Sequence, residues 1–169
     1  MDIRFKPVSV EDLPMLKRWM ENQHWRDWWG EPDNELGNIC DMIEGKDTTC
    51  PFIFFVDDEP AGYIQYWHVG HHQNPSWISQ NPWLKDLPRE AIGVDLSIGE
   101  SSKLSKGIGP AVLKKFTTAL LALGHETILI DPDPVNHRAV KAYEKAGFRK
   151  IAAYNKNTSD CVIMQYQSS

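Results

Sequence analysis

The chain has 169 residues, enough for one domain with a substantial hydrophobic core. It carries 18 Lys and Arg against 23 Asp and Glu, and this net charge of −5 argues against general nucleic-acid binding and favours a cationic partner. Three cysteines without C-x-x-C spacing argue against a disulfide framework or a zinc knuckle, and no apolar run reaches the length of a membrane span.

A strand and a capped helix are predicted first. Apolar and basic residues alternate over Ile3–Pro7, which is typical of a strand. Ser9 stands where a helix N-cap is expected, with Asp12 three residues later and Pro14 in the first turn. These signals predict a helix that runs to Met20.

A loop, a short helix and a hairpin follow. Polar residues interrupt the segment 21–35, which is predicted as a loop, and residues 35–45 are predicted as a short helix. Two aromatic and β-branched runs within residues 51–70 predict a hairpin that turns at Asp57–Glu59. Residues 71–88 contain three prolines and are predicted to be irregular.

Strands and helices alternate in the second half, and two strands close it. The predicted elements are a strand over 90–99, a helix over 110–124, a strand over 127–132, a helix over 135–147, and strands over 148–155 and 160–167. Hairpins require antiparallel strand pairs, while the two crossovers through helices require parallel ones. The sequence therefore predicts the α/β class with a mixed sheet.

A glycine-containing loop leads into the helix predicted over 110–124. Its sequence, SKLSKGIGPAVLKKF, covers Ser102–Phe116, and such a loop normally holds an anion at a helix N-terminus. It lacks the G-x-x-x-x-G-K-[ST] pattern of a nucleoside-triphosphate loop, and Val112 stands where a dinucleotide fingerprint has its third glycine. A pyrophosphate cradle of main-chain N–H groups stays open, and so does a plain lysine-bearing turn before a surface helix.

A second motif begins at the strand predicted over 127–132. The run IDPDPVNHRAVKAYEKAGF, Ile130–Phe148, contains A-x-x-x-Y-E-K-x-G-F and resembles the signature of the GNAT superfamily of N-acetyltransferases. The glycine loop precedes it, as it does in that family. The resemblance covers the whole chain and implies a single GNAT domain over residues 1–169, with a central mixed sheet flanked by helices.

Within the superfamily the sequence more closely resembles the aminoglycoside 6'-N-acetyltransferases. Four runs carry this likeness: DWWGE, EPAGYIQ, GVD followed by KLSKGIG, and DPDPVNHRAVKAYEKAGF. It implies a cytoplasmic antibiotic-resistance enzyme, monomer or homodimer, that transfers acetyl from acetyl-CoA to the 6'-amine of an aminoglycoside in a ternary complex. Two alternatives stay open: an acetyltransferase for a siderophore-precursor hydroxylysine or another small polyamine, and a module that binds acetyl-CoA without catalysis.

The resemblance also implies a set of acetyl-CoA contacts. They are Leu96, Ser97, Ile98, Lys103, Leu104, Ser105, Lys106, Gly107, Ile108, Gly109, Asn136 and Tyr143. The two glycines permit close backbone approach, and the two lysines add positive charge. The simpler role for Asn136 is that of a polar residue at a helix start.

Two positions depart from the family pattern. Leu104 stands where the superfamily usually has Gln or Arg, and we expect modest consequences because the backbone does most of the phosphate binding. Pro110 suits the first helical turn but lacks an N–H, so one possible phosphate donor is missing.

Asp95 and Tyr143 are the predicted catalytic residues. Asp95 lies in an apolar strand, where a carboxylate is costly unless it is functional or paired, so we expect it to act as the base, directly or through a water. Tyr143 is expected to protonate the leaving sulfur. An ion pair for Asp95 and half-buried packing for Tyr143 are the competing interpretations. A main-chain N–H near Leu96 is the expected oxyanion donor.

Carboxylates and flat side chains are expected to bind the cationic acceptor. Asp131 follows a strand, where ligands collect in α/β folds, although capping of the next helix is an alternative. Loop tryptophans can stack on sugars or attract an ammonium, with core packing as the alternative. The predicted substrate contacts are Trp28, Trp29, Gln65, Trp83, Asp95 and Asp131.

No metal is expected. The run HVGHH, His68–His72, has no cysteine or carboxylate partner at ligand spacing, and acetyl transfer to an amine needs no metal.

Overall fold

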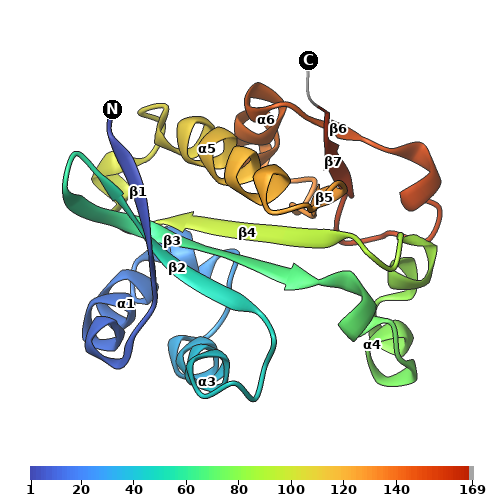
Figure 1. Ribbon diagram of the computed structural model, residues 1–169, viewed down its shortest axis with the longest axis horizontal. Coiled ribbons are helices and arrows are strands. Elements are labelled where there is room, and N and C mark those ends of the chain that lie inside the picture. The colour runs from blue at the N-terminus through green and yellow to red at the C-terminus, as the bar shows by residue number, and fades with distance from the viewer. Residues whose placement is uncertain (168–169) are drawn as a thin grey trace. The chain divides into compact units, whose positions relative to one another are not determined.

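The computed structural model describes residues 1–167 (Figure 1). In the first half lie β1 (Ile3–Pro7), α1 (Leu13–Met20), α2 (Gln23–Arg26), α3 (Pro32–Ile43), β2 (Cys50–Val56), β3 (Glu59–His68) and α4 (Pro75–Gln80). The second half adds β4 (Ile92–Ile98), α5 (Ile108–Ala122), β5 (Ile128–Ile130), α6 (His137–Ala146), β6 (Phe148–Lys150) and β7 (Met164–Tyr166).

The strands follow the order β1-β2-β3-β4-β5-β7-β6 in a mixed sheet. Strands β4 and β5 are parallel, whereas β1 with β2, β2 with β3, β5 with β7, and β6 with β7 are antiparallel. The predicted α/β class with a mixed sheet is therefore confirmed. The chain divides into two compact units, one of residues 1–66 and 96–108, the other of residues 67–95 and the chain from 109 onward. That residues 1–169 form one domain stays a prediction.

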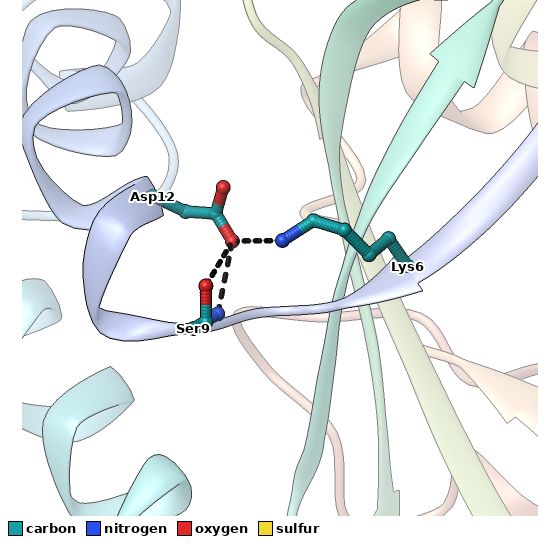
Figure 2. A network of polar contacts seen from close by, with 3 residues as sticks. All are labelled: Lys6, Ser9 and Asp12. Carbon is teal, nitrogen blue, oxygen red and sulfur yellow. Dashed lines mark hydrogen bonds and ion pairs between the residues drawn. The ribbon is translucent and has the colours of Figure 1, made fainter.

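The first helix begins as its sequence predicts. The main-chain N–H of Ser9 donates to Oδ2 of Asp12 at 2.9 Å, the arrangement of a capping box. Lys6 Nζ lies 2.6 Å from the same oxygen and the Ser9 hydroxyl donates to it at 3.3 Å, so one carboxylate oxygen receives three donors (Figure 2). A short 3-10 helix over Val10–Asp12 leads directly into α1.

The core of the first unit joins α1, α2 and α3 to strands β2 and β3. Trp25 is fully buried, and truncating such a side chain typically costs about 3–5 kcal/mol. In Figure 1, α1 and α3 lie on the same side of strands β1–β3. The buried cluster consists of Val8, Leu16, Trp19, Met20, Trp25, Ile39, Ile53 and Tyr63.

In the second unit, side-chain hydrogen bonds stabilise the loop between β6 and β7. Helix α6 ends at Gly147, whose φ of 108° lies in the left-handed region that a C-cap glycine adopts. The side chain of Asn155 accepts from the N–H of Ile163 at 2.8 Å and donates to the carbonyl of Ile151 at 2.7 Å. One amide side chain thus pairs with the backbone on both sides of the loop.

Three segments differ from the sequence predictions. The segment 21–35, predicted as a loop, contains α2 and the start of α3, because Pro32 suits a first helical turn. The segment 71–88, predicted as irregular, contains α4, which Asn74 caps by accepting from the N–H of Trp77 at 3.1 Å. The closing strands are shorter than predicted, because the Asn155 side chain occupies backbone groups that a longer ladder would pair.

Candidate active site

Asp95 and Asp131 are carried by neighbouring parallel strands. Gly93 of β4 pairs with Leu129 of β5. Continuing this register by two residues places Asp95 across from Asp131, which directly follows β5. Equivalent positions on parallel neighbours point to the same face of a sheet, so the two carboxyl groups meet. Both residues are half-buried.

The two carboxyl groups interact directly. Burial, and after it the negative charge of Asp95, raise the pKa of Asp131 well above its usual value. A hydrogen bond between the two side chains acts in the same direction, while a main-chain hydrogen bond of Asp131 opposes it. At Asp131 the largest influences on the pKa are therefore burial and the neighbouring carboxylate of Asp95.

Tyr143 lies on α6 within the electrostatic reach of both aspartates. Burial raises its pKa, and the charges of Asp95 and Asp131 raise it further. Its ring contacts that of Phe148, with centroids 6.5 Å apart. The hydroxyl therefore stays protonated at neutral pH and is available as a hydrogen-bond donor. Half-buried packing was the alternative to a catalytic role for Tyr143, and the ring is indeed half-buried.

Cys161 is a neighbour of Asp131 that sequence reasoning missed. Burial, then the charge of Asp131, and then those of Asp160 and Asp133 raise the pKa of its thiol to about 12. A thiol with such a pKa stays protonated and is a poor nucleophile. Cys161 lies thirty positions beyond Asp131 in a non-repetitive segment, so no spacing in the sequence points to their proximity.

The end of β4, predicted to hold the cofactor, is fastened by the segment that starts α2. His24 Nε2 lies 2.7 Å from the carbonyl oxygen of Ile98, and Asn22 Nδ2 donates to that of Gly99 at 3.2 Å. Ser97 is buried, and Leu96 and Ile98 are half-buried. The other ring nitrogen of His24, Nδ1, is buried and has no hydrogen-bond partner within residues 1–167. No periodicity or motif in the sequence predicts the contact of His24 with the end of β4.

The glycine loop turns sharply before α5. Ser105 and Gly107 adopt φ values of 61° and 79°, both in the left-handed region. A Cβ at Gly107 or Gly109 would meet no atom within 4 Å, so space stays open beside the backbone there. Lys106 is exposed, and Lys103 lies 3.9 Å from the Glu59 carboxylate. The sharp turn, the open space and the helix that follows suit an anion held by main-chain N–H groups.

The remaining residues of the predicted cofactor set have local roles in the structure. Leu104 is half-buried, and its N–H donates to the carbonyl of Ser101 at 3.1 Å. Ile108 is buried at the start of α5. Asn136 caps α6, because its Oδ1 accepts from the N–H of Ala139 at 3.3 Å. The cap is the simpler of the two roles considered for Asn136.

The predicted aromatic contacts differ in exposure. Trp28 is 46% exposed, whereas Trp29 is half-buried with its ring 5.7 Å from that of Tyr63 in an edge-on contact. Gln65 accepts from the Tyr63 hydroxyl at 2.6 Å. Trp83, in the other unit, packs against a buried cluster and is half-buried. Core packing, the alternative for the tryptophans, thus covers part of the ring surface of Trp29 and of Trp83, whereas much of Trp28 is exposed.

The histidine run lines a separate, open hollow. The rings of His68 and His71 lie 4.8 Å apart, and those of His68 and His125 lie 6.3 Å apart. Burial, then the charges of His71, His125 and His72, lower the pKa of His68. The hollow, of about 360 Å³, contains none of the predicted site residues; it is lined by His68, Gly70, His71, Arg89, Glu90 and Ala91. Within residues 1–167 no group of three or more His, Cys, Asp or Glu side chains is arranged to hold a metal ion.

Comparisons with known proteins agree on one family. The family profile described as an acetyltransferase (GNAT) domain matches residues 9–156. Aminoglycoside N(6')-acetyltransferase type 1 of Klebsiella pneumoniae is 28% identical over 169 residues, covering 96% of this chain and 81% of that protein.

Solved structures give the same result. AAC(6')-Ib with coenzyme A and kanamycin superposes with a TM-score of 0.79 at 25% identity, covering 97% of this chain and 94% of that one. The same enzyme with ribostamycin and coenzyme A has a TM-score of 0.79 at 25% identity, with 98% and 93% covered.

Proposed function

The chain belongs to the GNAT acetyltransferase family, and we propose that it transfers the acetyl group of acetyl-CoA to the 6'-amine of aminoglycoside antibiotics. The observation that carries the proposal is the pair of half-buried carboxyl groups, Asp95 and Asp131, beside a protonated tyrosine hydroxyl. A site of this kind attracts an ammonium group and has a donor for a leaving group. The similar enzyme AAC(6')-Ib has been solved with coenzyme A together with kanamycin or ribostamycin, which supports the acceptor class.

The chemistry divides among three side chains. An ammonium has no lone pair, so Asp95 takes a proton from the amine, which then attacks the thioester carbon. As the N–C bond forms and the C–S bond breaks, a main-chain N–H near Leu96 stabilises the oxyanion. Tyr143 acts as the acid that protonates the leaving sulfur, and Asp131 anchors the acceptor's positive charge. The protonated state of Cys161 supports direct transfer, because acyl transfer through that thiol would need a thiolate.

The cofactor would lie along the end of β4 and over the glycine loop. We assign the pantetheine arm to Leu96, Ser97 and Ile98, and the diphosphate to the main-chain N–H groups of the loop and the first turn of α5. The open space beside Gly107 and Gly109 supports this assignment. The other contacts are Lys103, Leu104, Ser105, Lys106, Ile108, Asn136 and Tyr143.

The acceptor would be held by carboxylates and aromatic faces. We assign Trp28, Trp29, Gln65 and Trp83 to this role together with Asp95 and Asp131. The exposed ring of Trp28 supports stacking, since an unused indole face is available for a sugar or an ammonium. The half-buried Trp29 and Trp83 offer smaller faces.

We further propose that the enzyme acts in the cytoplasm, as a monomer or a homodimer. The three cysteines are free thiols, which fits a reducing compartment. No helix within residues 1–167 is long and apolar enough to cross a bilayer.

A thiol-detection assay tests the function. Purified protein and acetyl-CoA are offered kanamycin, tobramycin, spermidine, lysine and hydroxylysine, and release of the CoA thiol is followed. We expect turnover with the two aminoglycosides, and mass spectrometry of kanamycin should show one added acetyl group on the 6'-nitrogen. A kanamycin derivative without the 6'-amine is the matched control and should give no turnover.

Other outcomes point to other functions. Turnover with hydroxylysine compounds alone would move the assignment to siderophore synthesis. Turnover with spermidine alone would indicate a polyamine acetyltransferase. Tight binding of acetyl-CoA without turnover on any amine would indicate a non-catalytic binding module.

A further inference from the structure

Asp95 and Asp131 are coupled by their position in the sheet as well as by their charge. Continued by two residues, the register of β4 and β5 brings Asp95 level with Asp131, which directly follows β5, and places the two side chains within reach of a hydrogen bond. A register shift of one residue would turn the side chains of one strand to the other face of the sheet. The pairing of β4 with β5 therefore keeps the backbone positions of the two aspartates close together.

A hydrogen bond between two carboxyl groups requires a proton on one of them. Two ionised carboxylates have acceptors only, so their contact would be repulsive. A carboxylic acid beside a carboxylate supplies the missing donor, and like charges at this distance favour a state with one proton. The physical chemistry of the contact therefore selects a singly protonated pair, with Asp131 as the acid and Asp95 as the carboxylate.

The neighbouring titratable groups favour retention of that proton. Tyr143 of α6 and Cys161 before β7 are both kept in their neutral, protonated forms. Asp133 and Asp160 add negative charge beside Cys161. Neither Tyr143 nor Cys161 therefore adds a charge beside the pair, and burial acts against a second negative charge there.

We propose that Asp95 and Asp131 form one acid–base unit that holds a single proton in the free protein and releases it when an ammonium group of the acceptor binds. Asp131 is then more than an anchor, because its proton occupies the place that the ammonium takes. This inference rests on the proposed function for the identity of the acceptor, but the state of the free protein does not depend on it.

The proton balance of the reaction follows from this unit. An ammonium and a thioester give an amide, a thiol and one proton. The pair loses its proton to solvent on binding, leaving two carboxylates around the ammonium. The nitrogen then gives up two protons as the N–C bond forms and the C–S bond breaks. One reaches the sulfur and the other returns to the pair, so the chemistry restores the starting state and the net proton is the one released at binding.

The free protein is tested first, without any ligand. Aspartate labelled with ¹³C at the side-chain carboxyl carbon reports each carboxyl by NMR, and Asp95→Asn and Asp131→Asn assign the two signals. We expect two coupled steps for the pair, the upper one well above the ordinary aspartate range near 3.9. In Asp131→Asn the Asp95 signal should titrate in one step at lower pH. Two independent steps in the ordinary range would overturn the proposal, and either variant alone suffices if the other does not fold.

Binding is tested next, with kanamycin as the probe and CoA present. Calorimetry is done in buffers of different ionisation enthalpy, at a pH where the NMR titration shows one proton on the pair. We expect about one more proton released per kanamycin by the wild type than by Asp131→Asn. Asp160→Asn is the matched control, since it removes an exposed acid near Cys161 and should release as many protons as the wild type. Equal release by the wild type and Asp131→Asn would overturn the proposal.

The pH profile separates this role from a merely structural one. If the pair must lose its proton before an ammonium binds, kcat/KM rises as pH rises through the upper step. In Asp131→Asn this acidic limb should move to lower pH by more than one unit, whatever the loss in absolute rate. An unmoved limb would assign Asp131 to anchoring alone. Failure of kanamycin to bind would instead count against the proposed function, because the NMR titration would stand.

Discussion

Asp12 and Asp131 are both partly buried aspartates, yet their pKa values move in opposite directions. At Asp12, burial acts to raise the pKa, but hydrogen bonds from Lys6 and from Ser9 outweigh it, and the pKa falls below its usual value. At Asp131 burial acts in the same direction and the next largest influence is a second carboxylate. At Asp12 the donors outweigh burial, whereas at Asp131 the second carboxylate adds to burial, which is the larger of the two influences there.

The surroundings of Asp12 and of Asp131 also differ in the sequence separation of the residues that interact there. Lys6, Ser9 and Asp12 lie within seven consecutive residues, and their contacts form as soon as β1 meets the first helical turn. Asp95 and Asp131 are separated by a loop and a whole helix, and they meet only when β4 and β5 pair. A compensated carboxylate stabilises the fold, whereas a carboxylate placed beside another one raises the free energy of the folded state unless a cation arrives. The second arrangement is therefore the one expected at a functional site.

The largest effect is expected from Asp95→Asn. An amide cannot accept the amine's proton, and loss of a general base typically costs about 10²–10⁴ in rate. Steady-state turnover of kanamycin should fall by this factor, while the dissociation constant of acetyl-CoA, measured by calorimetry, stays near that of the wild type. Turnover close to the wild-type value would refute the assignment of Asp95 as the base. The aspartate pair and Asp12 would then differ only in how they affect the stability of the fold.

A smaller loss is expected from Tyr143→Phe. The change keeps the ring contact with Phe148 and removes only the hydroxyl. A hydrogen bond to a charged group is worth about 1.5–3 kcal/mol, so kcat should fall roughly 10- to 150-fold if the hydroxyl stabilises the leaving thiolate. Because the pKa of Tyr143 is raised, the basic side of the wild-type pH profile should not report its ionisation. An unchanged kcat would leave Tyr143 with a packing role.

The sequence predicts the capped helix, the hairpin and the glycine-capped α6 because their signals are local. Ser9 with Asp12, the turn at Asp57 and Asp58, and Gly147 each act within a few residues. Helix α2 was missed because its four residues lie among polar breakers, and the extent of the closing strands was overestimated because nothing in the sequence shows that Asn155 pairs with the loop backbone.

The sequence proposes candidate members of the site but says nothing of their electrostatics. A carboxylate in an apolar strand singled out Asp95, and the family motif supplied Tyr143 and Asp131. Their coupling depends on the register between β4 and β5, which no single segment encodes. Cys161 and His24 were missed for the same reason, since each reaches its neighbour through tertiary packing.

The aspartate pair should limit stability at neutral pH. The pKa of Asp131 is raised in the folded state, so the folded protein binds this proton more tightly than the unfolded chain does. The free energy of unfolding therefore falls as pH rises from about 3.9 to the folded value and is level above it. Asp131→Asn removes this loss, worth about 1.4 kcal/mol for each unit of difference in pKa. Thermal unfolding should show a higher Tm for the variant, with a larger gain at pH 8 than at pH 5.

A matched variant controls for charge alone. Asp160→Asn removes an exposed carboxylate of the same unit and should change Tm little at either pH. A gain for Asp131→Asn that is equal at the two pH values would mean that the carboxyl is not titrating between them. A lower Tm for Asp131→Asn at pH 8 would mean that Asp131 is compensated, as Asp12 is, and the contrast between the two regions would fail.

The smallest effect is expected from Asp12→Ala, and its pH dependence has the opposite sign. The folded pKa of Asp12 is lowered, so its stabilising contribution is present above about 3.9 and is lost as pH falls through the folded value. Loss of a capping residue typically costs about 1 kcal/mol, or roughly 2–4 °C in Tm for a chain of this size. The deficit should be full at pH 7 and vanish at the lowest pH where the protein still folds. Lys6→Met should cost less, because Lys6 is 45% exposed and the Ser9 N–H still bonds to the carboxylate. A deficit that grew on acidification would show that Asp12 titrates like Asp131.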